Sequence, residues 1–194
     1  STPKPSSAAS DVYKRQDAES REFYCEVIMD EASKMNQMVK NLLTLNQLEF
    51  GDEDIVFDRF NLTALVRGVL QSMEIMADQA GAKILLHTEE DIYAWADEFK
   101  VEQVVKNYVS NACHHVSGDM VIEVKMVQKD GKVRVSVFNT GTPIPEADIA
   151  HIWDKFYKVD KAHTREYGGN GIGLSIVKAI MKLSLIHISE PTRR

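Results

Sequence analysis

Four glycines occupy six consecutive positions at residues 168–173, at the start of the stretch GGNGIGLSIVKAI (168–180). A flexible linker is a poor interpretation, because Ile172, Leu174, Ile176, Val177 and Ile180 recur at roughly helical spacing. Each glycine in ordered structure costs about 0.5–1 kcal/mol relative to alanine. A glycine-rich loop that leads into a helix lets main-chain N–H groups approach an anion, usually phosphate. The stretch therefore predicts a phosphate site, although a glycine-rich loop alone is a weak signal.

Two asparagines, Asn107 and Asn111, lie four residues apart in an expected helix over residues 98–116. This spacing places them on one face. An amide oxygen is a suitable ligand for magnesium, which keeps most of its waters and bridges to phosphates. Spacing alone leaves the alternative open that both asparagines are simply exposed to solvent.

A second polar site follows an expected strand in VFNTGTPIP (137–145), where the chain turns through Asn139, Thr140 and Gly141. A polar side chain at a strand end, followed by glycine, can read the edge of a flat ligand. The alternative is an ordinary turn, because asparagine, glycine and proline are all turn residues.

Aromatic and cationic residues alternate in IWDKFYKVDKAHTREYGG (152–169). A loop of this composition, hinged by glycines, could close over phosphates as a lid. The alternative is a solvated surface loop. The aromatic residues are Trp153, Phe156 and Tyr157, and the cations are Lys155, Lys158, Lys161 and Arg165.

One long helix is expected over residues 18–49 and should end at Gly51. Its apolar residues follow a spacing of three and four, which forms a seam that needs a partner. The seam could pack on its own domain, or it could pack in a helical bundle or a coiled-coil dimer, and the bundle is the interpretation that we favour. The seam consists of Ile28, Ala32, Met35, Val39, Leu42, Leu45 and Leu48.

Mixed helices and strands are expected after residue 52. Asn61 should cap a helix that Gly81 ends, and the strands KILLHTEE and IYAWAD follow. A hairpin turns at Asp130-Gly131, and a short helical piece is expected near residues 149–156. This order predicts an α+β sandwich beside a long helix. The helix over 98–116 should point Phe99, Val101, Val104, Val105, Tyr108, Val109 and Ala112 inward.

Composition excludes some classes of partner. The chain has 194 residues, a net charge of −6 and no basic stripe, so nucleic acid is not an expected partner. No run approaches the roughly 20 apolar residues of a membrane span, and no signal peptide opens the chain. The cysteines Cys25 and Cys113 match no ligand spacing, which favours a reduced cytosolic compartment.

The two ends of the chain do not fit their neighbours. The stretches SSAASDVYKRQ (6–16) and LSLIHISEPTRR (183–194) resemble in-frame translations of the two ends of a sequencing adapter. We expect residues 1–16 and 183–194 to be read-through artefacts and exclude them from the fold. The alternative is a disordered tail at each end.

The order of these motifs resembles the ATP-binding domain of sensor histidine kinases, with its N, G1, F and G2 boxes, over nearly all of residues 17–182. DEFKVEQVVKNYVSNA is similar to the N box, WDKFYKVDK to the F box and GGNGIGLSIVKAIM to the G2 box. EASKMNQMVKNLLTLNQLEFG resembles the second helix of the dimerisation and phosphotransfer hairpin. The resemblance implies that this helix lies in residues 17–52. A Bergerat-type two-layer α/β sandwich, truncated at its C-terminus, then occupies residues 53–182.

The resemblance also implies a role for each candidate residue. Asn111 would coordinate magnesium beside Asn107, Asn139 would face the adenine amino group of ATP, and Gly141 would shape that turn. Lid contacts to the phosphates would come from Lys155, Lys158 and Arg165. Main-chain N–H groups would meet the phosphates at Gly169, Gly171 and Gly173, and Phe156, Tyr157 and Leu174 complete the expected ATP site.

Three departures from the family pattern limit this assignment. Asn139 replaces the usual aspartate, which weakens the electrostatics although an amide oxygen still accepts a hydrogen bond. Pro143 replaces the second glycine of that motif, and we do not interpret either change as inactivating. None of the six histidines fits the phosphate acceptor. This fragment should therefore bind ATP but not phosphorylate itself.

The implied parent transfers the γ-phosphoryl group of ATP to a histidine and then to an aspartate of a response regulator. It would dimerise through residues 18–49 and be anchored in the bacterial plasma membrane, with this part cytoplasmic and making no membrane contact. The alternative is a nucleotide-binding dimerisation module without phosphotransfer. Other ATPases of the superfamily are disfavoured. They place a glutamate where Asn107 stands, and they lack the preceding helix.

Overall fold

The computed structural model describes residues 8–51, 55–159 and 171–183, with side chains from residue 20 onward. The chain divides into two compact units, residues 1–40 and 41–194. Across these described ranges, no helix combines the length and the apolar character needed to cross a membrane.

A single helix, α1 (Ala8–Phe50), contains 43 residues and accounts for the described part of the first unit. The long helix predicted over residues 18–49 is therefore confirmed, and it begins ten residues earlier. In the first unit its apolar residues Ile28, Met35 and Val39 are exposed, whereas Leu45 and Leu48 in the second unit are buried. The apolar seam thus keeps an uncovered portion within residues 20–40.

Gly51 ends α1, as predicted. Its N–H donates to the Gln47 carbonyl at 2.8 Å. A Cβ at this position would lie 2.5 Å from the same carbonyl oxygen, which is closer than real Cβ contacts. Glycine is therefore required at this turn.

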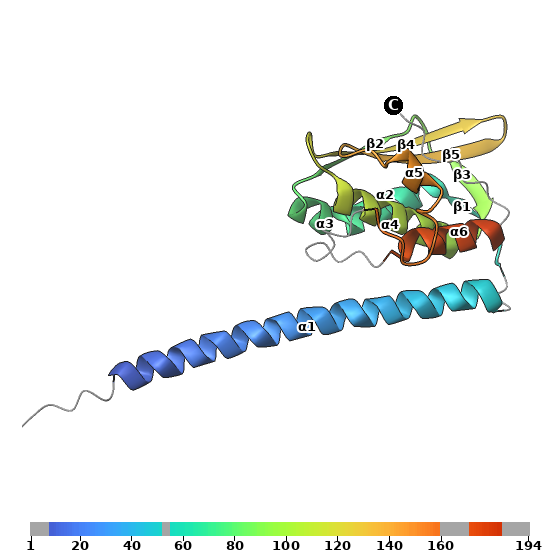
Figure 1. Cartoon of the computed structure of the whole chain (residues 1–194). Coiled ribbons are helices and arrows are strands. Elements are labelled where there is room, and N and C mark those ends of the chain that lie inside the picture. The colour runs from blue at the N-terminus through green and yellow to red at the C-terminus, as the bar shows by residue number, and fades with distance from the viewer. Residues whose placement is uncertain (1–7, 52–54, 160–170, 184–194) are drawn as a thin grey trace, which may run out of the picture. The chain divides into compact units, whose positions relative to one another are not determined.

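The second unit is an α+β fold built on a three-stranded sheet with the order β2-β4-β5 and a separate β1-β3 pair. β2 runs parallel to β4, while β4 pairs antiparallel with β5, and β1 with β3. Helices α2, α4 and α6 lie together on one side of the larger sheet (Figure 1). The elements are β1 (Asp58–Asn61), α2 (Leu62–Ser72), α3 (Glu74–Gln79), β2 (Lys83–His87), β3 (Tyr93–Ala96), α4 (Glu98–His115), β4 (Val121–Lys129), β5 (Lys132–Asn139), α5 (Glu146–Ile149) and α6 (Gly173–Leu183).

Side-chain caps lie at the N-terminal ends of helices α2 and α4. The Asn61 Oδ1 accepts from the Ala64 N–H at 2.9 Å, as the sequence predicts for the start of α2. The Asp97 Oδ1 accepts from the Lys100 N–H at 3.0 Å and caps α4. The Asp97 Oδ2 accepts from the Val56 N–H at 3.2 Å. This buried carboxylate therefore also holds the segment before β1 in place.

The predicted hairpin is confirmed and sets the register of the sheet. Asp130 and Gly131 have φ values of 53° and 70°, the left-handed pair that a two-residue turn requires. The resulting register places Asn139 opposite Ile122. The next residue, Thr140, donates its N–H to the Val121 carbonyl at 2.9 Å. The hairpin turn therefore fixes where the chain leaves β5.

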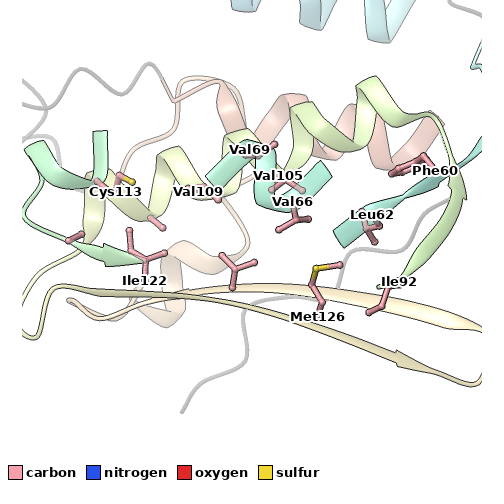
Figure 2. Packing of buried hydrophobic residues seen from close by; sticks show 14 of the residues in the cluster. Phe60, Leu62, Val66, Val69, Ile92, Val105, Val109, Cys113, Ile122 and Met126 are labelled. Atoms are coloured by element: carbon pink, nitrogen blue, oxygen red, sulfur yellow. The ribbon is translucent and has the colours of Figure 1, made fainter. Parts of the chain in front are cut away.

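The core lies between the helices and the sheet. Figure 2 shows Val66, Val105 and Val109 on the helical side and Ile122 and Met126 on the sheet side. The α4 residues Val105, Val109 and Ala112 are buried, as predicted. The inward placement of Phe99 is wrong, because this side chain is 80% exposed. Phe99 precedes Val105 by six residues, which rotates it about 120° from the buried face.

Three local predictions need correction. The helix expected from Asn61 to Gly81 is interrupted at Met73 and forms α2 and α3. The short strand β1 before it was not predicted, because four residues that pair with a distant strand carry little local signal. The helical piece expected near residues 149–156 instead forms α5 (Glu146–Ile149), and turns follow it.

Candidate functional site

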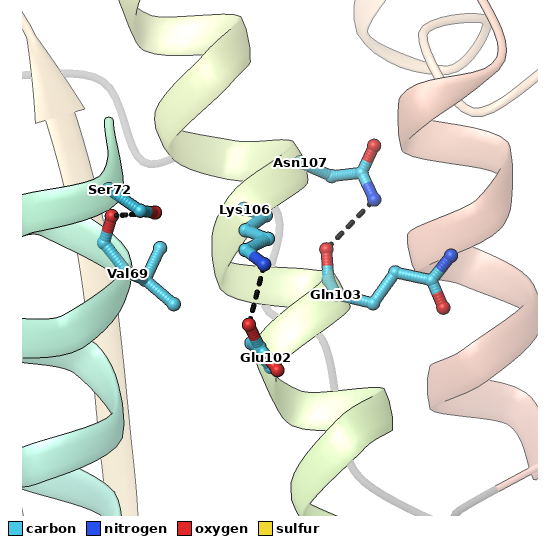
Figure 3. Close-up of polar contacts among 6 residues, drawn as sticks. All are labelled: Val69, Ser72, Glu102, Gln103, Lys106 and Asn107. Carbon is cyan, nitrogen blue, oxygen red and sulfur yellow. Dashed lines mark hydrogen bonds and ion pairs between the residues drawn. The ribbon is translucent and has the colours of Figure 1, made fainter. Parts of the chain in front are cut away.

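Helix α4 carries both candidate asparagines, and they are half-buried. Figure 3 shows Asn107 projecting from α4 on the side of α6. The Asn107 Nδ2 donates to the Gln103 carbonyl at 2.8 Å. A Cβ at Gly173 would lie 2.9 Å from the Asn107 Oδ1. The first residue of α6 therefore lies against Asn107, and its lack of a side chain permits this approach.

The described part of the glycine-rich loop meets the aromatic segment. The Phe156 N–H donates to the Gly171 carbonyl at 2.8 Å. Gly171 has a φ of +65°, and a Cβ there would lie 2.9 Å from both the Phe156 carbonyl carbon and the Tyr157 main-chain carbonyl oxygen. Two motifs that the sequence identifies separately are thus in direct contact.

The start of α6 is anchored by buried residues on either side of the last glycine. Ile172 and Ile176 are fully buried, and the Ser175 Oγ donates to the Ile172 carbonyl at 2.7 Å. Leu174 lies half-buried in the first turn. This anchoring holds the N-terminal end of an eleven-residue helix against α4. Such an end favours an anion.

The turn after β5 meets the C-terminal end of α4. The Asn139 Nδ2 donates to the His115 carbonyl at 3.3 Å and to the Thr140 carbonyl at 3.1 Å. Gly141 has a φ of +152°, and a Cβ there would lie 2.5 Å from the His115 carbonyl oxygen. Glycine is therefore required where this turn approaches the helix.

One face of α4 connects these contacts. Asn107, Asn111 and His115 follow one another at a spacing of four residues and share that face. Gly173 lies against Asn107 at one end of this face. At the other end, the Asn139 side chain donates to the main-chain carbonyl of His115. The structure thereby brings together the asparagine pair, the start of α6 and the turn after β5.

The aromatic segment is held by side chains of its own region. Tyr157 donates its hydroxyl to the Asp148 carboxylate, and this hydrogen bond raises the pKa of Tyr157. The Tyr157 ring lies 5.4 Å from the ring of His151, whose Nδ1 is 3.0 Å from an Asp154 oxygen. Phe156 is about half exposed with a φ of +64°, and Lys158 is half-buried.

Lys155 has a partner that sequence reasoning missed. Its Nζ lies 2.6 Å from the Glu49 Oε2 in the last turn of α1. The two residues are 106 positions apart, so no local pattern could reveal the pair. The ion pair is largely exposed and contributes at most about 1 kcal/mol. The expected lid contact of Lys155 with phosphate stays a prediction.

Two candidate residues, Arg165 and Gly169, lie outside the described residues. Within the described part of the chain, no group of three or more His, Cys, Asp or Glu side chains could hold a metal ion.

The chain is similar to known proteins over most of its length. The family model described as histidine kinase-, DNA gyrase B-, and HSP90-like ATPase matches residues 96–193, which is about half of the chain. The sensor histidine kinase YkoH of Bacillus subtilis (strain 168) is 31% identical over 169 residues, which cover 87% of this chain and 36% of the relative. The sensor histidine kinase WalK of the same organism is 29% identical over 160 residues, which cover 80% and 26%.

A solved structure supports the same relationship. The crystal structure of histidine kinase ThkA in complex with response regulator protein TrrA aligns with a TM-score of 0.59 and 31% identity. The alignment covers 70% of this chain and 40% of that one. The chain therefore spans well under half the length of these two curated relatives.

Replacing Gly141 with alanine should destabilise the second unit by about 1–3 kcal/mol, because the new Cβ would meet the His115 carbonyl in a disfavoured backbone conformation. Urea unfolding followed by circular dichroism measures the change. Gly68→Ala is the matched control, since its Cβ meets nothing within 4 Å and it lies inside α2. The control should gain up to about 1 kcal/mol. Equal effects of the two substitutions would contradict the contact.

Burial holds the pKa of His114 below its ordinary value of 6.5, and the neighbouring His115 lowers it further. A hydrogen bond that the His114 ring donates to the Ser110 main-chain carbonyl raises the pKa and offsets part of this shift. A lowered folded-state pKa means that the unfolded chain binds more protons in this pH window. Stability should therefore fall as the pH drops below about 6.5. His114→Gln should flatten this part of the profile in urea midpoints measured from pH 5 to 8. An unchanged profile would contradict the assignment to His114.

Proposed function

Because this chain belongs to the family of histidine kinase-, DNA gyrase B- and HSP90-like ATPases, we propose that residues 53–182 bind ATP with magnesium as the catalytic domain of a two-component sensor histidine kinase. The observation that carries the proposal is the convergence on one face of α4. The start of α6 lies against Asn107, and the turn of Asn139 and Gly141 meets the helix at His115.

This convergence supports one orientation of the nucleotide. Adenine lies at the turn after β5, where Asn139 offers a hydrogen-bonding edge. The triphosphate lies at the start of α6, where main-chain N–H groups and the helix dipole favour negative charge. Residues 107 and 115 are about 12 Å apart along the helix axis. The site therefore suits a ligand whose base and phosphates are well separated.

The glycines allow protein segments to pack closely around this face. A Cβ at Gly141, Gly171 or Gly173 would lie within 2.5–2.9 Å of neighbouring protein atoms, so each glycine lets two segments approach closely. The Asn111 oxygen would hold magnesium, together with phosphate oxygens and water. Lys155, Lys158 and Arg165 would contact phosphates, Gly169 would contribute its N–H, and Phe156, Tyr157 and Leu174 would border the nucleotide.

In the parent protein, the γ-phosphoryl group would pass to a histidine and then to an aspartate of a response regulator. The binding domain contributes position and charge rather than a covalent step. A neutral imidazole is already nucleophilic at pH 7. The proposal of a response regulator as partner is supported by the related kinase that was crystallised with one.

The proposed dimer contact lies on α1. Ile28, Met35 and Val39 are 66%, 66% and 53% exposed, which leaves apolar surface available on the first unit. A second copy of the helix would cover this surface in a bundle. The proposed division is a dimerisation helix in residues 17–52 and an ATP-binding domain in residues 53–182.

Replacing Asn111 with alanine should weaken binding of ATP at least about tenfold in the presence of magnesium and change it little in the presence of EDTA, because only the metal-dependent part is lost. Titration of the whole chain with a fluorescent ATP analogue, with and without magnesium, measures this. Asn36→Ala is the matched control, since Asn36 is exposed in α1 of the other compact unit. Equal losses in both variants, with both folded by circular dichroism, would contradict the metal role.

Phosphotransfer needs a separate test, because none of the six histidines matches the acceptor pattern. The chain with radiolabelled ATP and a separately supplied acceptor hairpin should label the hairpin and not itself. Binding of ATP without labelling would instead favour the alternative, a dimerisation module that holds nucleotide without turnover.

A further inference from the structure

We propose that the outer face of the β4–β5 hairpin binds an anionic lipid surface through four cationic side chains that surround one exposed apolar residue. These residues, named the hairpin patch, are Lys125, Val127, Lys129, Lys132 and Arg134. The inference does not depend on the proposed function, because the patch lies toward the turn of the hairpin, whereas the nucleotide site meets the other end of β5. It revises the expectation that this part of the parent makes no membrane contact.

Strand alternation gathers the hairpin patch on one face. Successive side chains of a strand point to opposite faces of a sheet. Met126 is buried in the core, while the residues of the patch occupy alternate positions on both strands and are all exposed. The register places Arg134 opposite Val127 and Lys132 opposite Lys129, so both strands contribute to one continuous surface.

The charge of the patch is opposite to the charge of the chain. The sequence has 29 acidic and 23 basic residues, a net charge of −6. From the start of β4 to the end of β5, in contrast, the four cations of the patch outnumber the acids Glu123 and Asp130. Net charge and runs of like charge do not reveal such a surface, because alternate residues on two strands form it.

The cations of the patch have no role in holding the fold together. In the described part of the chain, no ion pair joins any of the four to an acid. Lys129 and Lys132 are direct cross-strand partners, and like charges in such a pair are destabilising. The arrangement therefore lowers stability, which points to an anionic partner outside the described residues.

The acidic loop after β2 is held away from the face that carries the patch. It contains acids at positions 89–91, and the Glu90 carbonyl accepts from the Thr63 Oγ1 of α2 at 3.4 Å. This contact holds the loop toward the helical side of the sheet. β2 pairs with β4 only from Val121 to Lys125, so the rest of the hairpin extends past β2 (Figure 1). The end of the hairpin can therefore meet a plane of negative charge.

Two features favour a lipid surface over other anionic partners. Three of the four cations are lysines, whose hydrated ammonium groups on flexible stems suit a diffuse field of charge better than bidentate recognition of one group. Val127 is 42% exposed among these cations. An apolar side chain contributes nothing to a contact with nucleic-acid phosphates, but it can enter the boundary between lipid headgroups and acyl chains.

The decisive experiment measures co-sedimentation of the whole chain with vesicles. Vesicles of phosphatidylglycerol and phosphatidylcholine in equal parts should bind the chain, and vesicles of phosphatidylcholine alone should not. Binding should weaken as the salt concentration rises, because salt screens the attraction. Absence of binding to both kinds of vesicle, or equal binding to both, would overturn the inference.

A double variant places the contact on the hairpin. Lys129→Gln combined with Lys132→Gln should weaken binding to the anionic vesicles at least about tenfold. It should also leave the urea midpoint unchanged or higher, because it removes a like-charge pair. Lys178→Gln combined with Lys182→Gln is the matched control, since both lysines are exposed on α6 and the change in net charge is the same. Equal losses in the two double variants would overturn the assignment to the hairpin patch.

A duplex DNA at the same salt concentration separates a lipid surface from a general polyanion. The chain should bind the anionic vesicles and leave the DNA free. Comparable affinity for both, lost together in the hairpin double variant, would replace the lipid assignment with a nucleic-acid one.

Discussion

The packing of α4 is the constraint on which the rest of the structure depends. Val105 and Val109 bury one face of the helix in the core, while Asn107, Asn111 and His115 occupy the face that meets α6 and the turn after β5. A rotation by one residue, about 100°, would expose the core valines and separate the site residues at once. Because close-packed interiors resist such changes, the hydrophobic core holds the site in position.

Glycines at Gly141 and Gly173 allow other segments to pack closely against this helix. Gly141 and Gly173 occupy two points where other segments approach α4 closely, and at each a Cβ would lie within 2.9 Å of a neighbouring atom. Their conformational cost is offset because the approach brings main-chain donors and a strand-end amide to the same face. Gly171 lies two residues before Gly173, and its carbonyl accepts a hydrogen bond from the Phe156 N–H, which holds the loop against the aromatic segment. The glycine pattern thus reflects packing as well as any contact with phosphate.

Local patterns in the sequence predicted many of the helices, strands and turns. Contacts between residues that are distant in the sequence could not be predicted from such patterns. The caps at Asn61 and the turn at Asp130 act within a few residues, and both are confirmed. Strand β1, the Glu49–Lys155 pair and the hydrogen bond from Asn139 to His115 depend on partners 24 or more residues away. The motifs could therefore be placed on their elements, but the orientation of the Asn139 amide could not be read from them.

The most direct test of the central claim is a nitrogen–proton NMR titration of the whole chain with ATP and magnesium. The account predicts that the largest shifts include the side-chain amides of Asn111 and Asn139 and the main-chain amides of Gly171 and Gly173, with one common affinity. Shifts confined to the β1–β3 pair or to α1, or shifts at the glycines with a different affinity from those at the asparagines, would contradict a single nucleotide site on this face of α4.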